Sequence, residues 1–284
     1  MKILVTGYNG QLGYDVVKRG EKQGLEMQGI GIEDLDITNE AAVYEFVDKV
    51  KPDAIIHCAA YTAVDKSEDD KELCWNVNVE GTKYLATAAK KLNAKFVYIS
   101  TDYVFDGEGT HAFVETDVPN PVGYYGLTKY EGEKVVRSLI DNNFIVRISW
   151  VFGINGNNFI KTMLRLGETR NELNVVGDQI GSPTYTYDLA RLLVDMVVTE
   201  KYGTYHATNE GFCSWAEFAQ EIFEIAEQDV KVNSITTEEY PTRAVRPKNS
   251  RMSKQKLIDN GFEPLQDWKK ATKHYITQLQ QEVK

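Results

Sequence analysis

Residues 1–13 read MKILVTGYNGQLG, and this stretch decides the fold. Lys2 to Val5 form a short run of mainly apolar residues, which predicts a strand buried on both faces of a parallel sheet. Gln11 to Lys22 show helical spacing, with apolar residues on one side and charged residues on the other. The three glycines of the stretch therefore fall between a strand and a helix.

This glycine turn has the chemistry of a pyrophosphate-binding loop. Gly7 can adopt a positive φ, Gly10 lets the backbone approach a phosphate, and Gly13 lets the helix pack close to the strand. The free N–H groups at the start of the helix favour an anion. The turn predicts a dinucleotide site, and an ordinary glycine-rich loop is the alternative interpretation. The expected contacts in this turn are Gly7, Asn9, Gly10, Gln11, Leu12 and Gly13.

The second strand, expected over residues 25–32, bears on the choice of cofactor. An acid at the end of this strand commonly binds a ribose 2′-hydroxyl and repels a 2′-phosphate. Neither an acid nor an arginine stands at Gly29 to Gly31, although Glu33 and Asp34 follow closely. The pattern favours NADP(H), with NAD(H) as the alternative.

Further cofactor contacts are expected along the next strands. Asp36 can accept a hydrogen bond from an adenine amino group, and Thr38 is expected to cap the following helix. The strand at residues 53–60 ends in small residues, which leave room for a cofactor. Asn78 is expected on a helix, either near the active site or on a solvated surface. The remaining expected contacts are Asp36, Ile37, Ala59, Ala60, Tyr61, Thr62, Asn78, Ile99, Tyr125 and Lys129.

A catalytic group is predicted from Thr101, Tyr125 and Lys129. Thr101 follows the apolar strand at residues 95–100, and parallel sheets bind ligands at the carboxyl ends of their strands. Tyr125 and Lys129 are four residues apart, so they share one face of a helix. We expect Lys129 to lower the pKa of Tyr125 from about 10 and to bind the nicotinamide ribose. Tyr125 would then exchange a proton with a carbonyl oxygen that Thr101 holds. A chance Tyr-x-x-x-Lys pair is the alternative, but the glycine turn favours a nicotinamide-dependent enzyme.

Longer motifs narrow this prediction. The glycine spacing resembles the extended branch of the short-chain dehydrogenase/reductase superfamily. Five segments resemble the dTDP-4-dehydrorhamnose reductase family: residues 100–107, 125–133, 147–153, 178–184 and 246–250. The resemblance covers nearly the whole chain. It implies NAD(P)H-dependent reduction of the 4-keto group of dTDP-4-dehydro-6-deoxy-L-mannose, which gives dTDP-L-rhamnose.

The resemblance also implies a substrate site. Its expected contacts are Thr101, Asp102, Tyr103, Trp150, Asp178, Gln179 and Arg246. Some members of the family bind Mg²⁺ through carboxylates at a dimer interface. Asp15 and Asp188 match two acidic positions here, but Tyr187 replaces a third carboxylate, so we predict no metal site. A monomer and a homodimer both remain open.

Other functions also remain open. A 4,6-dehydratase usually needs an acid after Asp102, where this chain has Tyr103. A 4-epimerase, a reductase of another nucleotide-4-ketosugar, and a non-catalytic NADP-binding regulatory subunit are the further alternatives. The intact Thr101, Tyr125 and Lys129 argue against the regulatory subunit.

The composition agrees with a cytoplasmic enzyme. The chain has 284 residues and a net charge of −10, which argues against a general nucleic-acid surface. The sequence has neither a membrane-length apolar run nor a recognisable targeting peptide. Cys58, Cys74 and Cys213 show no pairing or metal spacing, which favours a reducing compartment. The charged run at residues 66–71 is interpreted as a solvated helix start.

We predict an α/β fold, a Rossmann-type doubly wound parallel sheet with a smaller, discontinuous C-terminal substrate-binding lobe. Residues 1–150 and about 183–210 are assigned to the nucleotide-binding domain, and about 151–182 and 211–284 to the second lobe. Substrate is expected between them. Later elements are predicted as helices at 159–166, 187–198, 215–226 (capped by Ser214) and beyond 260, with strands at 173–176 and 203–207.

Overall fold

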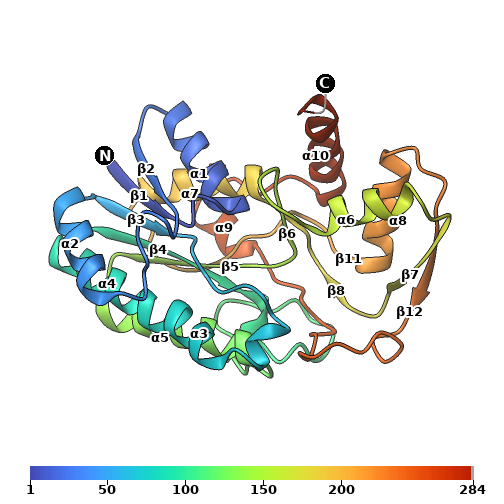
Figure 1. The fold of residues 1–284 in the computed structure, drawn as a ribbon, viewed down its shortest axis with the longest axis horizontal. Helices are drawn as coiled ribbons and strands as arrows, with labels where there is room; N and C mark the ends of the chain where they lie inside the picture. The colour runs from blue at the N-terminus through green and yellow to red at the C-terminus, as the bar shows by residue number, and fades with distance from the viewer. Residues whose placement is uncertain (283–284) are drawn as a thin grey trace.

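The computed structural model describes residues 1–282, and a six-stranded parallel sheet forms its centre (Figure 1). The spatial order is β10-β5-β4-β3-β1-β2. From β1, the chain adds β2 on one side of the sheet and then β3, β4, β5 and β10 on the other. Such a reversal of strand order leaves a crevice at the carboxyl ends of β1 and β3. The strands are β1 (Lys2–Thr6), β2 (Glu26–Ile30), β3 (Ala54–His57), β4 (Lys95–Thr101), β5 (Asn143–Ile148) and β10 (Gly203–His206).

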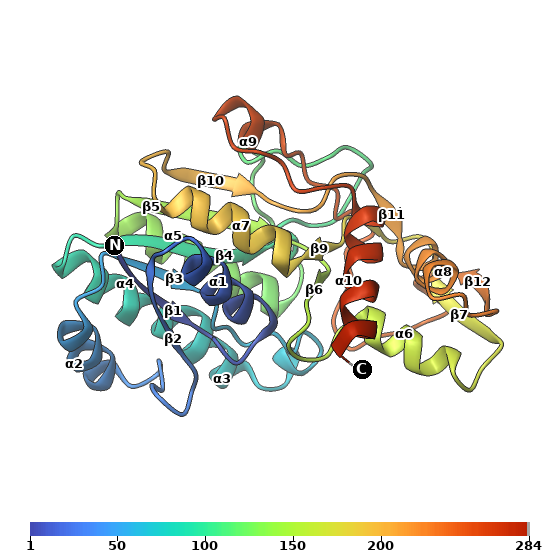
Figure 2. The same ribbon diagram turned by 90° about the horizontal axis from the view of Figure 1, so that it is seen from above.

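Helices cover both faces of this sheet (Figures 1 and 2). Successive residues of β1 point to opposite faces, so Ile3 and Val5 join one apolar cluster and Leu4 joins another. The first cluster includes α1 (Gln11–Lys22) and α7 (Thr186–Val197). The second includes α2 (Glu40–Val50), α4 (Thr82–Lys91) and α5 (Tyr124–Leu139). Burial on both faces confirms the predicted doubly wound fold.

A second group of elements packs beside the carboxyl ends of the strands (Figure 1). A third apolar cluster, which includes Phe152, Phe218 and Tyr275, holds it together. Ser214 caps α8 as predicted, because its hydroxyl accepts from the Glu217 N–H while the Glu217 carboxylate accepts from the Ser214 N–H. The group contains α6 (Phe159–Gly167), β7 (Glu172–Val176), α8 (Trp215–Ile225), β12 (Lys231–Ile235) and α10 (Trp268–Glu282).

Shorter elements connect the two groups. Strand β6 (Val151–Phe152) pairs with β9 (Thr184–Tyr185), and β8 (Ile180–Gly181) pairs with β11 (Cys213–Ser214). The short helices are α3 (Lys71–Trp75) and α9 (Gln255–Asp259), with 3₁₀ turns at Lys66–Glu68 and Asp102–Val104 and a π-helical turn at Asn76–Gly81. None of the helices within residues 1–282 is both long and apolar enough to span a bilayer.

Three details differ from the sequence predictions. The second strand ends at Ile30, before the predicted limit. Asn39, not Thr38, caps α2, because its side chain accepts from the Ala42 N–H while the Thr38 hydroxyl donates to Asp36. Leu257, Phe262 and Leu265, assigned to the second lobe, pack in the first cluster beneath the main sheet. The choice of helix cap and the packing of C-terminal residues on the main sheet depend on tertiary contacts, which local sequence patterns do not indicate.

Candidate active site

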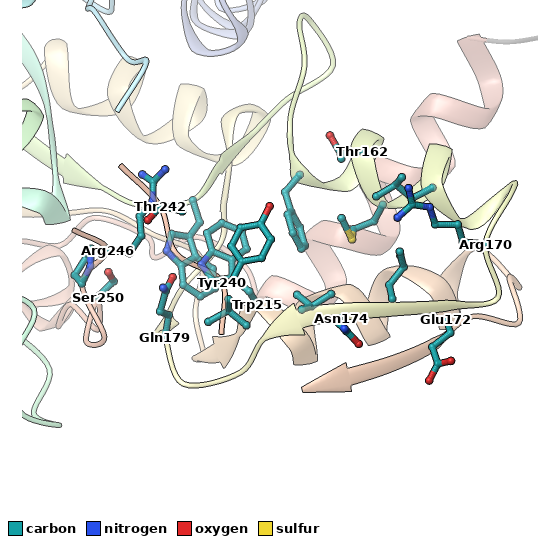
Figure 3. Close-up of a pocket in the computed structure, with 18 of the residues that line it drawn as sticks. Thr162, Arg170, Glu172, Asn174, Gln179, Trp215, Tyr240, Thr242, Arg246 and Ser250 are labelled. Carbon is teal, nitrogen blue, oxygen red and sulfur yellow. The ribbon is translucent and has the colours of Figure 1, made fainter. Parts of the chain in front are cut away.

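Two cavities meet at the carboxyl edge of the main sheet. The first, of about 840 Å³, lies along the glycine turn and the ends of the central strands. The second, of about 890 Å³, lies between the main sheet and the second group of elements (Figure 3). Tyr103 and Trp150 line both cavities. A ligand reaching through the junction would therefore pass these two side chains.

The glycine turn leaves no room for side chains. Gly7 has φ +73°, and a Cβ atom there would lie 2.7 Å from the Ala59 backbone nitrogen. A Cβ atom on Gly13 would lie 2.3 Å from the Gly7 carbonyl oxygen. Gly10, the N-cap of α1, provides no side-chain cap for the helix. The turn thus fits a dinucleotide pyrophosphate, which can approach closely and bind the first N–H groups of α1.

Acidic residues lie at the other end of the first cavity. Glu33 lines the cavity and accepts a hydrogen bond from the Asn9 side chain at 2.8 Å. Asp36 also lines it and accepts from both the backbone and the hydroxyl of Thr38. Among the described residues that line this cavity, Lys129 is the only lysine or arginine. The described part of the lining therefore provides no cation for a 2′-phosphate beside Glu33 and Asp36.

The proposed catalytic side chains come together at the junction. Thr101 ends β4, and Tyr125 and Lys129 lie in the first turns of α5. The Tyr125 side chain lies beside that of Thr101, whose hydroxyl donates to Asp102 at 2.9 Å. The Tyr103 ring packs edge-on against the Tyr125 ring, with centroids 5.5 Å apart. These contacts place two hydroxyl groups side by side in the cavity wall.

The ionisation of this group differs from the sequence prediction. Burial raises the pKa of Tyr125 above its ordinary value, and the nearby Asp102 carboxylate raises it further. Burial lowers the pKa of Lys129 to about 7, although Glu133 opposes this shift. The expected lowering of the Tyr125 pKa by Lys129 is therefore absent in the protein alone, because desolvation dominates. Burial also raises the pKa of Asp102 to about 6.

A buried ionic network supports the catalytic helix. Glu133, one turn beyond Lys129, is fully buried and accepts hydrogen bonds at 2.8 Å from both Nε and an Nη of Arg147. The Ser100 hydroxyl donates to the same carboxylate at 2.6 Å, and Arg137 donates from the surface. The sequence motifs contain Glu133 and Arg147, but their spacing does not indicate that they pair. Helix α5 is thereby attached to β4, which ends in the catalytic threonine, and to the neighbouring strand β5.

Asn78 lies behind the first cavity and does not line it. It is buried in the π-helical turn, where its oxygen accepts from the Tyr61 N–H at 2.8 Å. Its amide donates to the Thr128 hydroxyl at 3.0 Å. It therefore joins the loop at Tyr61 to α5, and a solvated surface position is excluded. The other cofactor residues predicted from sequence all line the first cavity.

The charged run at residues 66–71 does more than face solvent. Ser67 within it is buried, and Glu68 accepts from the Tyr124 N–H at the start of α5. Just before the run, Asp65 accepts from an Arg246 Nη atom at 2.5 Å. Most of the run is exposed at the start of α3, as interpreted, but Ser67 is buried and Glu68 has a partner distant in the sequence.

The second cavity brings together most of the predicted substrate residues. Gln179 and Arg246 line it together with Tyr103 and Trp150, and an Arg246 Nη atom donates to the Tyr103 hydroxyl at 3.0 Å. Asp178 does not line the cavity, because its carboxylate accepts from the backbone and hydroxyl of Thr237. Several further residues line this cavity that local sequence patterns did not predict, among them Asn174, Trp215, Tyr240 and Thr242 (Figure 3).

The two acids considered for a metal are engaged within the protein. Thr186 donates to Asp15, and Asn209 and Gln266 donate to Asp188. Burial raises the pKa of Asp15 to about 6, which favours a protonated carboxyl over a cation ligand at slightly acid pH. Across residues 1–282, no group of three His, Cys, Asp or Glu side chains is arranged to hold a metal.

The doubly wound sheet, the glycine turn and the Thr-Tyr-Lys group together define an extended short-chain dehydrogenase/reductase. Residues 1–281 match the family described as RmlD substrate binding domain. A dTDP-4-dehydrorhamnose reductase of Aggregatibacter actinomycetemcomitans is 42% identical over 287 residues, covering 96% of this chain and 97% of the relative. The chain belongs to the dTDP-4-dehydrorhamnose reductase family.

Solved structures agree with this assignment. A dTDP-4-dehydrorhamnose reductase of Clostridium acetobutylicum superimposes with a TM-score of 0.96 at 47% identity, covering 99% of this chain and 100% of that one. A dTDP-4-dehydrorhamnose reductase of Bacillus anthracis, solved in complex with NADP, gives a TM-score of 0.95 at 42% identity and covers 98% of this chain and 100% of that one.

Proposed function

We propose that this protein uses NADPH to reduce the 4-keto group of dTDP-4-dehydro-6-deoxy-L-mannose, giving dTDP-L-rhamnose. The observation that carries the proposal is that Thr101 and Tyr125 line the first cavity beside Tyr103, which also lines the second cavity. A cofactor bound along the glycine turn and a sugar bound in the second cavity would meet at this pair. The family relatives named above carry the same activity in their names.

The catalytic residues have complementary roles in this proposal. When bound, the nicotinamide would supply a hydride to the carbonyl carbon of the sugar. Thr101 holds the carbonyl oxygen by a hydrogen bond, and Tyr125 delivers the proton that completes the hydroxyl group. The raised pKa of Tyr125 keeps its phenol protonated at neutral pH, as a proton donor requires. Lys129 binds the nicotinamide ribose, and its charge stabilises the phenolate left behind.

The residues of the second cavity suit a nucleotide sugar. Arg246 supplies a positive charge for the diphosphate, and Gln179 and Asn174 offer amide groups for hydrogen bonding. Trp150 presents an apolar surface to the deoxysugar. Asp178 acts indirectly, by holding the segment around Thr237. We also propose a cytoplasmic location, which suits the three free cysteines and a nucleotide-sugar substrate.

The test follows absorbance at the reduced-nicotinamide band. Purified protein is mixed with dTDP-4-dehydro-L-rhamnose and either NADPH or NADH. We expect one reduced cofactor to be oxidised for each sugar reduced, with the faster rate on NADPH. A 4-epimerase would show no net oxidation, because it returns the hydride to its substrate. Lack of oxidation by protein that demonstrably binds NADPH would overturn the proposal.

A further inference from the structure

Trp150 has an unusual backbone conformation. Its φ angle is +49°, in the left-handed region that bulky side chains rarely adopt. The residue lies between β5 and β6, immediately before Val151, and its carbonyl oxygen accepts a hydrogen bond from the Thr184 N–H at 3.1 Å. Such strained residues persist only where the surrounding structure holds them, and they gather at ligand sites.

The indole of Trp150 is held on two sides. It stacks on the indole of Trp215, with ring centroids 3.8 Å apart and planes within 17°. A Cβ atom on Gly181 would lie 3.0 Å from Cε2 and Cζ2 of Trp150, so the Gly181 backbone packs closely against the ring. The stacked indole lines both cavities at their junction.

Trp215 is itself well supported. It is the first residue of α8, immediately after the Ser214 capping box. The Phe159 ring packs against it at 4.7 Å between centroids. Trp215 lines the second cavity (Figure 3) and does not line the first.

We propose that Trp215 is a positioning residue that acts through Trp150. Its stacking keeps the indole of Trp150 in the wall where the sugar ring must lie to reach Thr101 and Tyr125. This inference rests on the proposed function, since it assigns the stacked pair to the sugar end of the nucleotide sugar. Aromatic pairs add stabilisation beyond the area they bury, so loss of the stack should release Trp150 from its strained orientation.

The experiment compares Trp215→Leu and Trp215→Phe with a matched control, Trp268→Phe. Trp268 is buried in the same group of elements but lines neither cavity. For Trp215→Leu we expect KM for dTDP-4-dehydro-L-rhamnose to rise about three- to ten-fold while the Kd for NADPH stays unchanged. Trp215→Phe should rescue part of the loss, and Trp268→Phe should leave KM unchanged.

Two further measurements test whether Trp215 acts through Trp150. Two stacked indoles couple their electronic transitions, so circular dichroism of the wild type should show a couplet that Trp215→Phe removes and Trp268→Phe retains. In a Trp150→Leu background, adding Trp215→Leu should cause little further rise in KM.

Three results would overturn the inference. The first is that Trp215→Leu raises KM as much in the Trp150→Leu background as it does in the wild type. The second is that Trp215→Leu raises the Kd for NADPH by the same factor as KM for the sugar. The third is that the circular dichroism of the wild type shows no couplet. Wild-type protein that binds NADPH but does not oxidise it with the sugar would instead overturn the proposed function. The couplet would still test the stack in that case.

Discussion

The side-chain carboxylate of Glu68 accepts a hydrogen bond, at 2.8 Å, from the backbone N–H of Tyr124, the first residue of α5. Gly123, the N-cap of this helix, has no side chain to do so. An acid from a distant 3₁₀ turn therefore caps the helix that carries Tyr125. The neighbouring Asp65 binds Arg246, so the same turn also contacts the wall of the second cavity.

Glu68→Ala should loosen the start of α5. Loss of a helix cap costs about 1 kcal/mol of protein stability. The negative carboxylate also interacts favourably with the positive end of the helix dipole. We expect a lower melting temperature and a several-fold lower kcat, because Tyr125 lies in the first turn. Glu72→Ala is the control, since Glu72 is exposed on α3. Equal effects of the two substitutions on melting temperature and kcat would show that the cap does not matter.

Tyr125→Phe should remove the proton donor and little else. The phenyl ring can keep its edge-on contact with Tyr103, so the fold and the Kd for NADPH should be nearly unchanged. Turnover should fall by at least about 100-fold, the usual contribution of a positioned acid. A Phe variant that retained wild-type turnover would remove Tyr125 from the mechanism.

Lys129→Met should change both cofactor binding and the pH dependence of stability. Lysine in an unfolded chain has a pKa of about 10.4, whereas burial lowers that of Lys129 to about 7. Between these values the unfolded chain binds more protons, so wild-type stability rises with pH. We expect Lys129→Met to melt higher than the wild type at about pH 6, with an advantage that shrinks toward pH 10.

The same variant should bind NADPH more weakly, because the proposed contact with the ribose is lost. Thermal unfolding without cofactor and titration with NADPH measure the two effects separately. An advantage in melting temperature that did not vary with pH would contradict a lowered pKa for the buried Lys129. Unchanged NADPH affinity would contradict the ribose contact.

Glu133→Gln should be strongly destabilising. Glutamine leaves the buried Arg147 guanidinium without a counter-charge, and breaking a buried pair in this way costs about 3–5 kcal/mol. Glu131→Gln on the same helix removes only a partly exposed pair with Lys134, which should cost less than about 1 kcal/mol. Urea unfolding of the two variants gives the comparison. Similar free energies of unfolding would mean that the buried network contributes nothing.

Gly7→Ala should abolish tight cofactor binding. A methyl group there would lie 2.7 Å from the Ala59 backbone nitrogen, at a φ that favours glycine. Gly24→Ala is a matched control, because Gly24 has φ +77° but nothing within 4 Å of the added Cβ atom. Both variants place alanine at a positive φ, which strains the backbone. Only in Gly7→Ala does the added methyl group also clash with the Ala59 backbone. NADPH titration should therefore separate them, and equal affinities would show that the turn tolerates a side chain.

Local patterns predicted those parts of the molecule that depend on nearby residues. The spacing of Gly7, Gly10 and Gly13 and the helical repeat after them are local, and both were confirmed. The partners of Glu68 and Glu133 were not predicted, since they arise only when α5 packs on distant segments. Trp215 was missed for the same reason, because its stacking partner Trp150 lies 65 positions earlier in the chain.

The late strand β10 has a consequence for synthesis on the ribosome. It pairs with β5 through residues 203–206, and Leu257, Phe262 and Leu265 complete the cluster beneath that edge. Until these residues emerge, the nascent chain exposes an unpaired edge on β5 and an unfinished apolar face. The first 150 residues therefore cannot bury their own sheet, and we expect its folding to be completed only after Leu265 has emerged.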